Sequence, residues 1–180
     1  PDAPMELPWT ILLHDIAKPA TASTGKDGRI HFYGHEKVGA TMTKTILDRL
    51  RFSSDKIDTI VFTVRHHMQF KDAPQMRKAT LRRMLMRPNF ELELEQHRID
   101  CLGSHGKLDI YDFIRTEQAA LAEQPALFEP LITGRDLIAL GMIPGPALGK
   151  LLNEIRDRQL AEEFASRENA LTWAKEKAAL

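Results

Sequence analysis

Apolar residues recur every three or four positions along most of the chain, which is the spacing of an amphipathic helix. Leu7, Ile11, Leu12 and Ile16 mark one such stretch over residues 5–17. No stretch alternates apolar and polar residues over the length of a strand. We therefore expect an all-α fold, with short helices over residues 76–86 and after Thr133, and further helices over residues 35–50, 56–68, 90–102, 108–121, 147–164 and 167–179.

Residues that start or stop helices support this pattern. Pro19 is expected to end the first helix, because proline lacks the N–H that a helix interior needs. Residues 21–30 are predicted to form a loop, since Thr, Ser and Gly cluster there. Thr133, with Asp136 three residues later, is typical of a capping box.

Gln124-Pro125 is the predicted domain boundary. It would separate a larger helical domain, residues 1–124, from a smaller helical tail, residues 125–180. The predicted helix over residues 147–164 has an apolar face that needs cover. We therefore expect the tail to pack against other protein rather than swing free.

The composition is that of a globular protein, with 43% hydrophobic and 28% charged residues. Lys+Arg and Asp+Glu both number 25, so the chain has no overall basic surface for nucleic acid, and RNA binding would need a local patch. The single cysteine, Cys101, excludes an internal disulfide and fits a reducing cytoplasm. No apolar run approaches about 18 residues, so we expect no membrane span. The first residue is Pro1, and no signal peptide is visible, so we expect a chain that begins inside a longer protein or was trimmed.

A histidine and an aspartate, His14 and Asp15, stand together where the first predicted helix ends. Imidazole nitrogen and carboxylate oxygen both bind divalent cations. Similar groups stand near the ends of later helices, and of the adjacent His66 and His67 we prefer His67, since the two project to different sides. Each could be an ordinary polar residue of a helix end. Together they favour a metal site formed by His14, Asp15, His35, His67 and Asp100.

Such a site suits the hydrolysis of a phosphate ester, because a divalent ion lowers the pKa of bound water and polarises a phosphoryl oxygen. Mixed His and Asp ligands favour Mn, Fe, Ni or Zn, and Mg less. Asp15 and Lys18 are the candidate catalytic residues. The Lys18 ammonium would bind and neutralise phosphate, although a solvated surface lysine is an equal alternative. His31, His66 and His105 are candidates for the substrate pocket.

Several motifs together resemble the HD superfamily of metal-dependent phosphohydrolases. More narrowly, they are similar to the HD domain of the bacterial tRNA nucleotidyltransferase/poly(A) polymerase family. The resemblance covers nearly the whole chain. Its motifs are Leu13-His14-Asp15-Ile16-Ala17-Lys18-Pro19, Phe32-Tyr33-Gly34-His35-Glu36, Arg51-Phe52-Ser53, Arg65-His66-His67-Met68, Asp100-Cys101-Leu102-Gly103-Ser104-His105-Gly106 and Leu131-Ile132-Thr133-Gly134-Arg135-Asp136-Leu137.

The resemblance implies an HD-type helical domain in which His14 and Asp15 are the signature metal ligands and Asp100 is the closing aspartate. It also implies phosphodiesterase or phosphatase activity on nucleotides or RNA ends. The residues after about 125 would resemble the part that contacts tRNA. Arg135 and Lys150 are the candidate phosphate contacts there, although plain surface charge is the alternative.

Two departures from the family pattern leave other functions open. No histidine precedes His14, whereas the superfamily pattern begins with one, and no Gly-Gly pair leads to an Asp-x-Asp. By itself the chain is therefore not expected to add nucleotides. It could instead be the non-catalytic, tRNA-binding body of a nucleotidyltransferase whose head lies upstream, or a free-standing HD protein that binds a nucleotide as a regulator.

Overall fold

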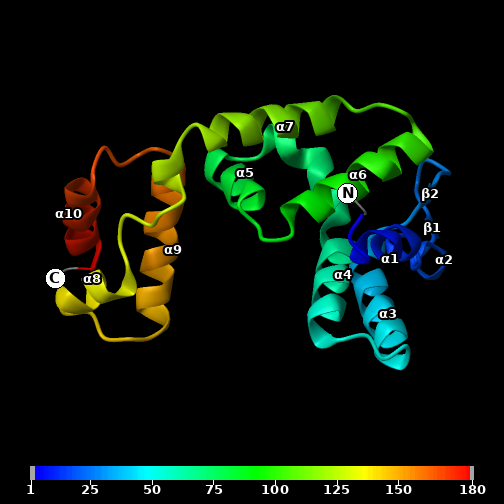
Figure 1. Ribbon diagram of the computed structural model, residues 1–180, viewed down its shortest axis with the longest axis horizontal. Helices are drawn as coiled ribbons and strands as arrows, with labels where there is room; N and C mark the ends of the chain where they lie inside the picture. Colours follow the sequence, from blue (N-terminus) through cyan, green and yellow to red (C-terminus); the bar gives the residue numbers. More distant parts are fainter. Residues whose placement is uncertain (1–2, 179–180) are drawn as a thin grey trace. The chain divides into compact units, whose positions relative to one another are not determined.

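The computed structural model describes residues 3–178 as an almost entirely helical chain (Figure 1). The expected all-α fold is confirmed, and no described helix is long and apolar enough to cross a membrane. The last residue of the final predicted helix, Ala179, lies outside the described residues. The elements are α1 (Glu6–Leu13), α2 (Lys18–Thr21), β1 (Ser23–Thr24), β2 (Ile30–His31), α3 (His35–Arg49), α4 (Ser54–His66), the 3-10 helix η1 (His67–Gln75), α5 (Lys78–Leu85), α6 (Phe90–Ser104), α7 (Asp109–Ala122), the 3-10 helix η2 (Pro125–Leu127), α8 (Gly134–Ala139), α9 (Pro146–Leu160) and α10 (Arg167–Ala178).

The first predicted helix is interrupted. Helix α1 ends at Leu13, residues 14–17 form a turn, and α2 begins at Lys18. Pro19 therefore lies in the first turn of α2 and does not end a helix, because a first turn needs no N–H from proline. The turn matters for chemistry: successive residues of a continuous helix point about 100° apart, and the break frees His14 and Asp15 from that constraint.

The predicted loop over residues 21–30 contains a short antiparallel ladder that the sequence did not indicate. Strands β1 and β2 pair in the register Ser23 with His31 and Thr24 with Ile30. Two residues per strand are too few to produce a visible alternation of apolar and polar positions.

The chain divides into two compact units. Unit 1 comprises Pro1–Pro74 and Pro88–Ile114, and unit 2 comprises Gln75–Arg87 and Arg115–Leu180. The chain thus leaves unit 1 to supply α5 to unit 2 and then returns. The domain boundary expected after residue 124 stays a prediction, because compactness does not establish which segments fold on their own.

The core of unit 1 is built by α1, α3 and α4. Leu13, Leu47, Ile60 and Val64 are buried together there. Helices α3 and α4 form a hairpin, so the start of α3 and the end of α4 lie at the same end of the pair (Figure 1). Because α4 also packs against α1, the end of α1 is held next to them. Hydrophobic packing therefore brings three helix ends to one region.

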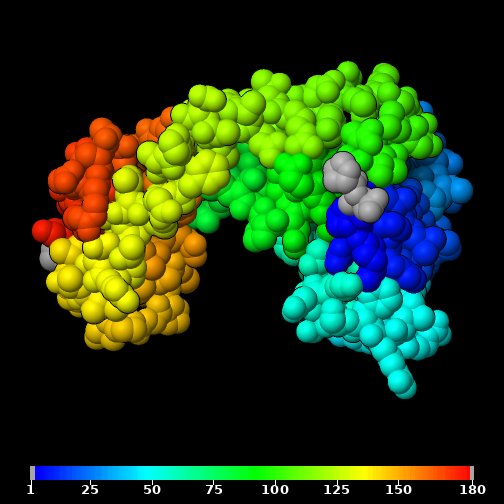
Figure 2. All heavy atoms as spheres, in the orientation of Figure 1, coloured from blue at the N-terminus to red at the C-terminus, as the bar shows by residue number. Residues whose placement is uncertain are grey.

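Unit 2 has a separate core formed by α8, α9 and α10, in which Leu137 and Ile155 are buried. The yellow atoms of α8 pack against the orange atoms of α9 (Figure 2). The Thr133 and Asp136 side chains form the expected capping box. Helix α5 also packs on α9, where the buried Arg82 guanidinium donates to the carbonyl oxygen of Leu160 at 2.7 Å.

We expect Leu47→Ala to destabilise unit 1 by about 2–5 kcal/mol, because its fully buried side chain would leave a cavity. Leu12→Ala is the matched control, since Leu12 is 69% exposed despite its place in the predicted apolar stripe. It should change the free energy of unfolding by less than about 0.5 kcal/mol. Urea titration followed by the fluorescence of Trp9 measures both. Equal losses in the two variants would contradict this core.

Candidate metal centre

The five side chains predicted as ligands lie at or near the ends of helices in unit 1. His14 caps the C-terminus of α1, and Asp15 lies in the turn that follows. His35 is the first residue of α3, and His67 directly follows α4. Asp100 lies in the last turns of α6, which packs against both α1 and α4. The packing of unit 1 thus delivers all five to one place.

The two carboxylate oxygens of Asp15 face different partners. Oδ1 lies 3.3 Å from His35 Nε2 and 3.9 Å from His67 Nε2. Oδ2 lies 3.2 Å from His14 Nε2, which is itself 3.4 Å from Asp100 Oδ1. Ligand atoms of Asp15, His35 and His67 all lie within 4.8 Å of one another. Asp15 therefore stands between two histidine-containing groups.

The three histidines share one orientation. In each ring Nδ1 is hydrogen-bonded to a carbonyl oxygen three residues earlier, at 2.7–2.8 Å, and these oxygens belong to Ile11, Phe32 and Val64. A carbonyl oxygen only accepts hydrogen bonds, so Nδ1 must carry the proton. In neutral His14, His35 and His67, Nε2 is then left with a free lone pair that faces the cluster, as in histidines that bind metals.

These lone pairs lack suitable donors. The Nε2 atoms of His35 and His67 are only 3.1 Å apart, and both residues are buried. Among residues 3–178, the buried Nε2 of His14 has no well-directed hydrogen bond, despite the nearby carboxylates. Buried acceptors without a donor are costly. A mixed set of imidazole nitrogens and carboxylate oxygens that needs a positive partner fits a divalent cation.

Burial and neighbouring charges shift the pKa values of three residues of the cluster. Burial lowers the pKa of His67, and the neighbouring His14 and His35 lower it further. Contact with His14 lowers the pKa of Asp100. Burial works against a charged His14, but the Asp100 carboxylate and the Ile11 carbonyl prevail and raise its pKa. Near neutral pH, His67 is therefore neutral and Asp100 ionised, the forms that can ligate a metal, whereas the raised pKa of His14 favours its protonated form until a cation displaces that proton.

Lys18 lies beside the cluster. Its Nζ is 2.5 Å from Asp15 Oδ2 and 5.8 Å from the centre of the Phe32 ring. It is thus an ion-paired cation rather than a freely solvated lysine, and it neutralises the Asp15 oxygen that does not face His35.

The other predicted site residues are not part of the cluster. His31 pairs with Asp27 at 3.2 Å. His66 Nδ1 is bonded to the Phe62 carbonyl, and His66 lines a cavity that His35 also lines. His105 is the exposed C-cap residue of α6. In unit 2, Arg135 on α8 and Lys150 on α9 are both exposed. The roles of these residues stay predictions.

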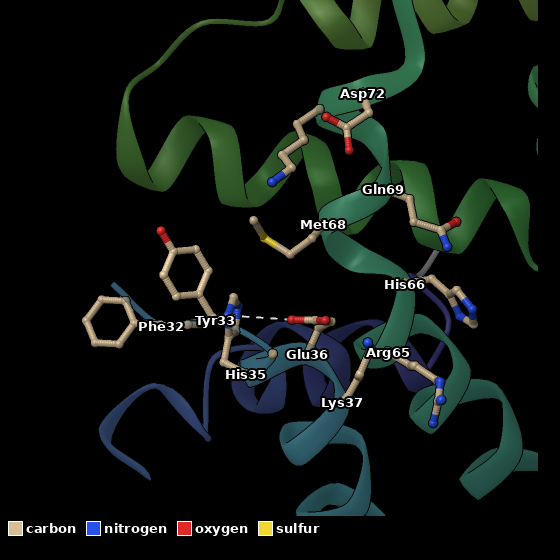
Figure 3. Close-up of a pocket in the computed structure, with 12 residues that line it drawn as sticks. Phe32, Tyr33, His35, Glu36, Lys37, Arg65, His66, Met68, Gln69 and Asp72 are labelled. Carbon is tan, nitrogen blue, oxygen red and sulfur yellow. Dashed lines mark hydrogen bonds and ion pairs between the residues drawn. The ribbon is translucent and has the colours of Figure 1, made fainter. Parts of the chain in front are cut away.

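A cavity of about 400 Å³ opens next to the cluster (Figure 3), and its wall includes His66, which the sequence predicted for the substrate pocket. His35 belongs to both the cluster and the cavity. The lining also includes Tyr33, Lys37, Arg65 and Lys71, to which the sequence assigned no role, although Tyr33 and Arg65 belong to the quoted motifs. Their closeness in sequence to His35 and His67 was the available signal.

Comparison with known proteins agrees with this geometry. The HD domain family matches residues 4–100, more than half of the chain. The chain belongs to the HD domain family. The match contains four of the five clustered side chains and ends at the fifth, Asp100. No solved structure matches the chain.

Several curated relatives are tRNA nucleotidyltransferases. The A-adding tRNA nucleotidyltransferase of Deinococcus radiodurans is 33% identical over 98% of this chain and 43% of its own length. The CC-adding tRNA nucleotidyltransferase of Thermus thermophilus is 30% identical over 94% and 39%. The multifunctional CCA protein of Verminephrobacter eiseniae is 28% identical over 91% and 40%. This HD-domain chain therefore spans about two fifths of the length of these relatives.

We expect His14, His35 and His67 to share the tautomer with the proton on Nδ1 in mildly alkaline solution, where imidazoles are neutral. His105 is the internal control, because its Nδ1 accepts a hydrogen bond from the Lys107 N–H at 3.1 Å and the proton must sit on Nε2. Long-range proton–nitrogen NMR correlation of the metal-free chain distinguishes the two forms. A proton on Nε2 of His35 or His67 would contradict the described orientation.

Proposed function

We propose that unit 1 is a metal-dependent phosphohydrolase that cleaves phosphate esters in nucleotides or at RNA ends. The observation that carries this proposal is the cluster in which Asp15, His35 and His67 present ligand atoms within 4.8 Å of one another, with His14 and Asp100 at the other oxygen of Asp15. Membership of the HD domain family supports it. So does the adjoining cavity, which gives a substrate access to His35.

The residues that would hold the cation fall into two sets. Asp15 Oδ1, His35 and His67 form the tighter one. Asp15 Oδ2, His14 and Asp100 form the other, and Lys18 already engages this oxygen. The donors favour Mn, Fe, Ni or Zn over Mg. When bound, a divalent cation supplies Lewis-acid activation of a phosphate ester and promotes the ionisation of water.

The chain's own residues would prepare the substrate. Lys18 carries a positive charge at the edge of the cluster and complements a phosphate that arrives there. Asp15 lies between both histidine groups, so its carboxylate can orient the cation and accept a hydrogen bond from an attacking water. The buried rings of His35 and His67 are held by their carbonyl partners, which limits reorganisation during the reaction.

We further propose that the chain acts as part of a longer protein that binds tRNA. The relatives' printed names, and matches that cover more than nine tenths of this chain, support this role. Arg135 and Lys150 in unit 2 are the candidate phosphate contacts. No carboxylate lies within 4 Å of either among the residues that the structure describes. A cytoplasmic location, which tRNA binding would require, remains a prediction.

We expect His67→Ala to lower the affinity for the divalent ion by at least about 100-fold. Loss of a residue that only hydrogen-bonds to a metal ligand already lowers metal affinity about 10–100-fold. Phosphodiesterase activity on a 2′,3′-cyclic nucleotide should be lost with it. Metal content by mass spectrometry and the initial rate measure the two effects.

His66→Ala is the matched control for this test, because it removes a neighbouring imidazole that lines the adjoining cavity but does not belong to the group of Asp15, His35 and His67. It should keep its metal, with any effect confined to KM. Loss of metal from both variants alike, or a wild-type chain that retains no divalent ion, would contradict the metal site.

We expect the double variant Arg135→Ala/Lys150→Ala to bind tRNA more weakly. The slope of the logarithm of affinity against the logarithm of salt concentration should become shallower by roughly one to two, since each lost phosphate contact removes about 0.9. Lys44→Ala/Arg49→Ala removes the same charge from exposed positions on α3 and should leave the slope unchanged. Filter binding over a range of salt concentrations measures this. Identical slopes in the two double variants would exclude the proposed contacts.

A further inference from the structure

The cavity beside His35 extends the region around the candidate ligands. We call it the Arg65 cavity, after one of its lining residues. Its volume of about 400 Å³ is within the range of small-molecule sites. A second cavity of about 340 Å³ also has Tyr33, His35 and Lys71 in its wall and adds Lys18, which contacts Asp15. A ligand in the Arg65 cavity would therefore lie within reach of the cluster.

The wall of the Arg65 cavity carries three exposed cations, Lys37, Arg65 and Lys71. In the described part of the chain, none of them has a carboxylate within 4 Å. Other cations of unit 1 do: Lys44 Nζ lies 2.7 Å from Asp48, and Arg98 forms a 2.6 Å contact with Glu95. Cations without an internal partner remain available to an anion from solution.

Two carboxylates, Glu36 and Asp72, line the same cavity. Glu36 Oε2 lies 3.9 Å from His35 Nδ1, and the dashed line in Figure 3 marks this contact. Figure 3 also shows Asp72 at the opposite end of the view from Lys37 and Arg65. Glu36 lies at the same end of the view as Lys37 and Arg65, so the two cations there exceed one carboxylate and can accept a negative group.

An aromatic face borders the cavity. The Tyr33 side chain is 75% exposed, and its ring stacks on His31 with centroids 5.1 Å apart and planes 10° from parallel. A rigid, exposed ring is suited to stacking with a nucleobase, which contributes about 1–3 kcal/mol per base in single-strand binding.

We propose that the Arg65 cavity binds a second phosphate group of the substrate, with the base against Tyr33. The site would then take a nucleoside polyphosphate or a nucleic-acid end in preference to an ester with a single phosphate. This inference rests on the proposed function, because the first phosphate is assigned to the His/Asp cluster. Both kinds of substrate, the nucleoside polyphosphate and the nucleic-acid end, carry a second phosphate within one nucleotide of the first.

The test compares AMP with ADP, which differ by one phosphate, by calorimetric titration of the metal-loaded chain, and ADP is supplied throughout as its non-hydrolysable α,β-methylene analogue. Wild type should bind ADP about 10-fold more tightly than AMP, the contribution of one charge-assisted contact. A bound cation can itself favour ADP over AMP, so the variants decide whether the preference comes from the Arg65 cavity. Arg65→Ala should remove most of the preference for ADP while AMP affinity stays within about 2-fold. Arg49→Ala, at the far end of α3, should change neither value.

Two further probes separate the sources and test the aromatic contact. Tighter binding of the dinucleotide pApA than of ADP identifies a nucleic-acid end, and the reverse identifies a nucleoside polyphosphate. Tyr33→Ala should weaken ADP but not inorganic pyrophosphate, and Tyr33→Phe should restore ADP binding, because stacking needs the ring and not the hydroxyl. Equal weakening of pyrophosphate by Tyr33→Ala would overturn the base contact.

Equal affinities of wild type for AMP and ADP would overturn the second-phosphate subsite, as would an Arg65→Ala variant that loses both ligands alike. Failure of the proposed function looks different. A chain that hydrolyses no phosphate ester but keeps the Arg65-dependent preference for ADP refutes the hydrolase alone. A chain that hydrolyses esters without this preference refutes the subsite alone.

Discussion

The close approach of imidazole nitrogens to one another is the constraint on which the account of this protein depends. Backbone carbonyls fix the proton of each clustered histidine on Nδ1, so the Nε2 lone pairs of His35 and His67 meet at 3.1 Å. Two acceptors at that distance repel each other unless a positive charge lies beside them. The carboxylate of Asp15 adds negative charge to the same point. A divalent cation satisfies all of these groups together.

The fold of unit 1 makes this arrangement rigid. The α3–α4 hairpin sets His35 and His67 side by side, and the packing of α1 on α4 brings the turn after Leu13 against them. The core residues stabilise the site by holding helix ends in place, so the ligands need no contacts among themselves to converge. In the proposed function, the choice of substrate depends on what surrounds the cluster, namely Lys18 at its edge and the Arg65 cavity beside His35.

Much of this could be predicted from sequence because it is locally encoded. Periodicity indicated most helices, and the capping box at Thr133 is complete within four residues. The sequence also singled out the five side chains of the cluster, whose role as metal ligands stays a prediction. The break after Leu13 was missed, since Pro19 is compatible with the end of one helix and with the start of the next. The cations of the Arg65 cavity were missed because its wall joins the start of α3 to the end of α4 and the region after it. Only tertiary packing brings those cations to one place.

An anomalous-scattering crystal structure of the purified chain, measured at the absorption edges of its metals, tests the central claim most directly. The account predicts an ion bound by Asp15, His35 and His67, with metal–ligand distances of about 2.0–2.2 Å for a first-row metal such as zinc. A chain that crystallises with these side chains converged but with a proton-mediated contact between His35 and His67, and no anomalous peak, would contradict it.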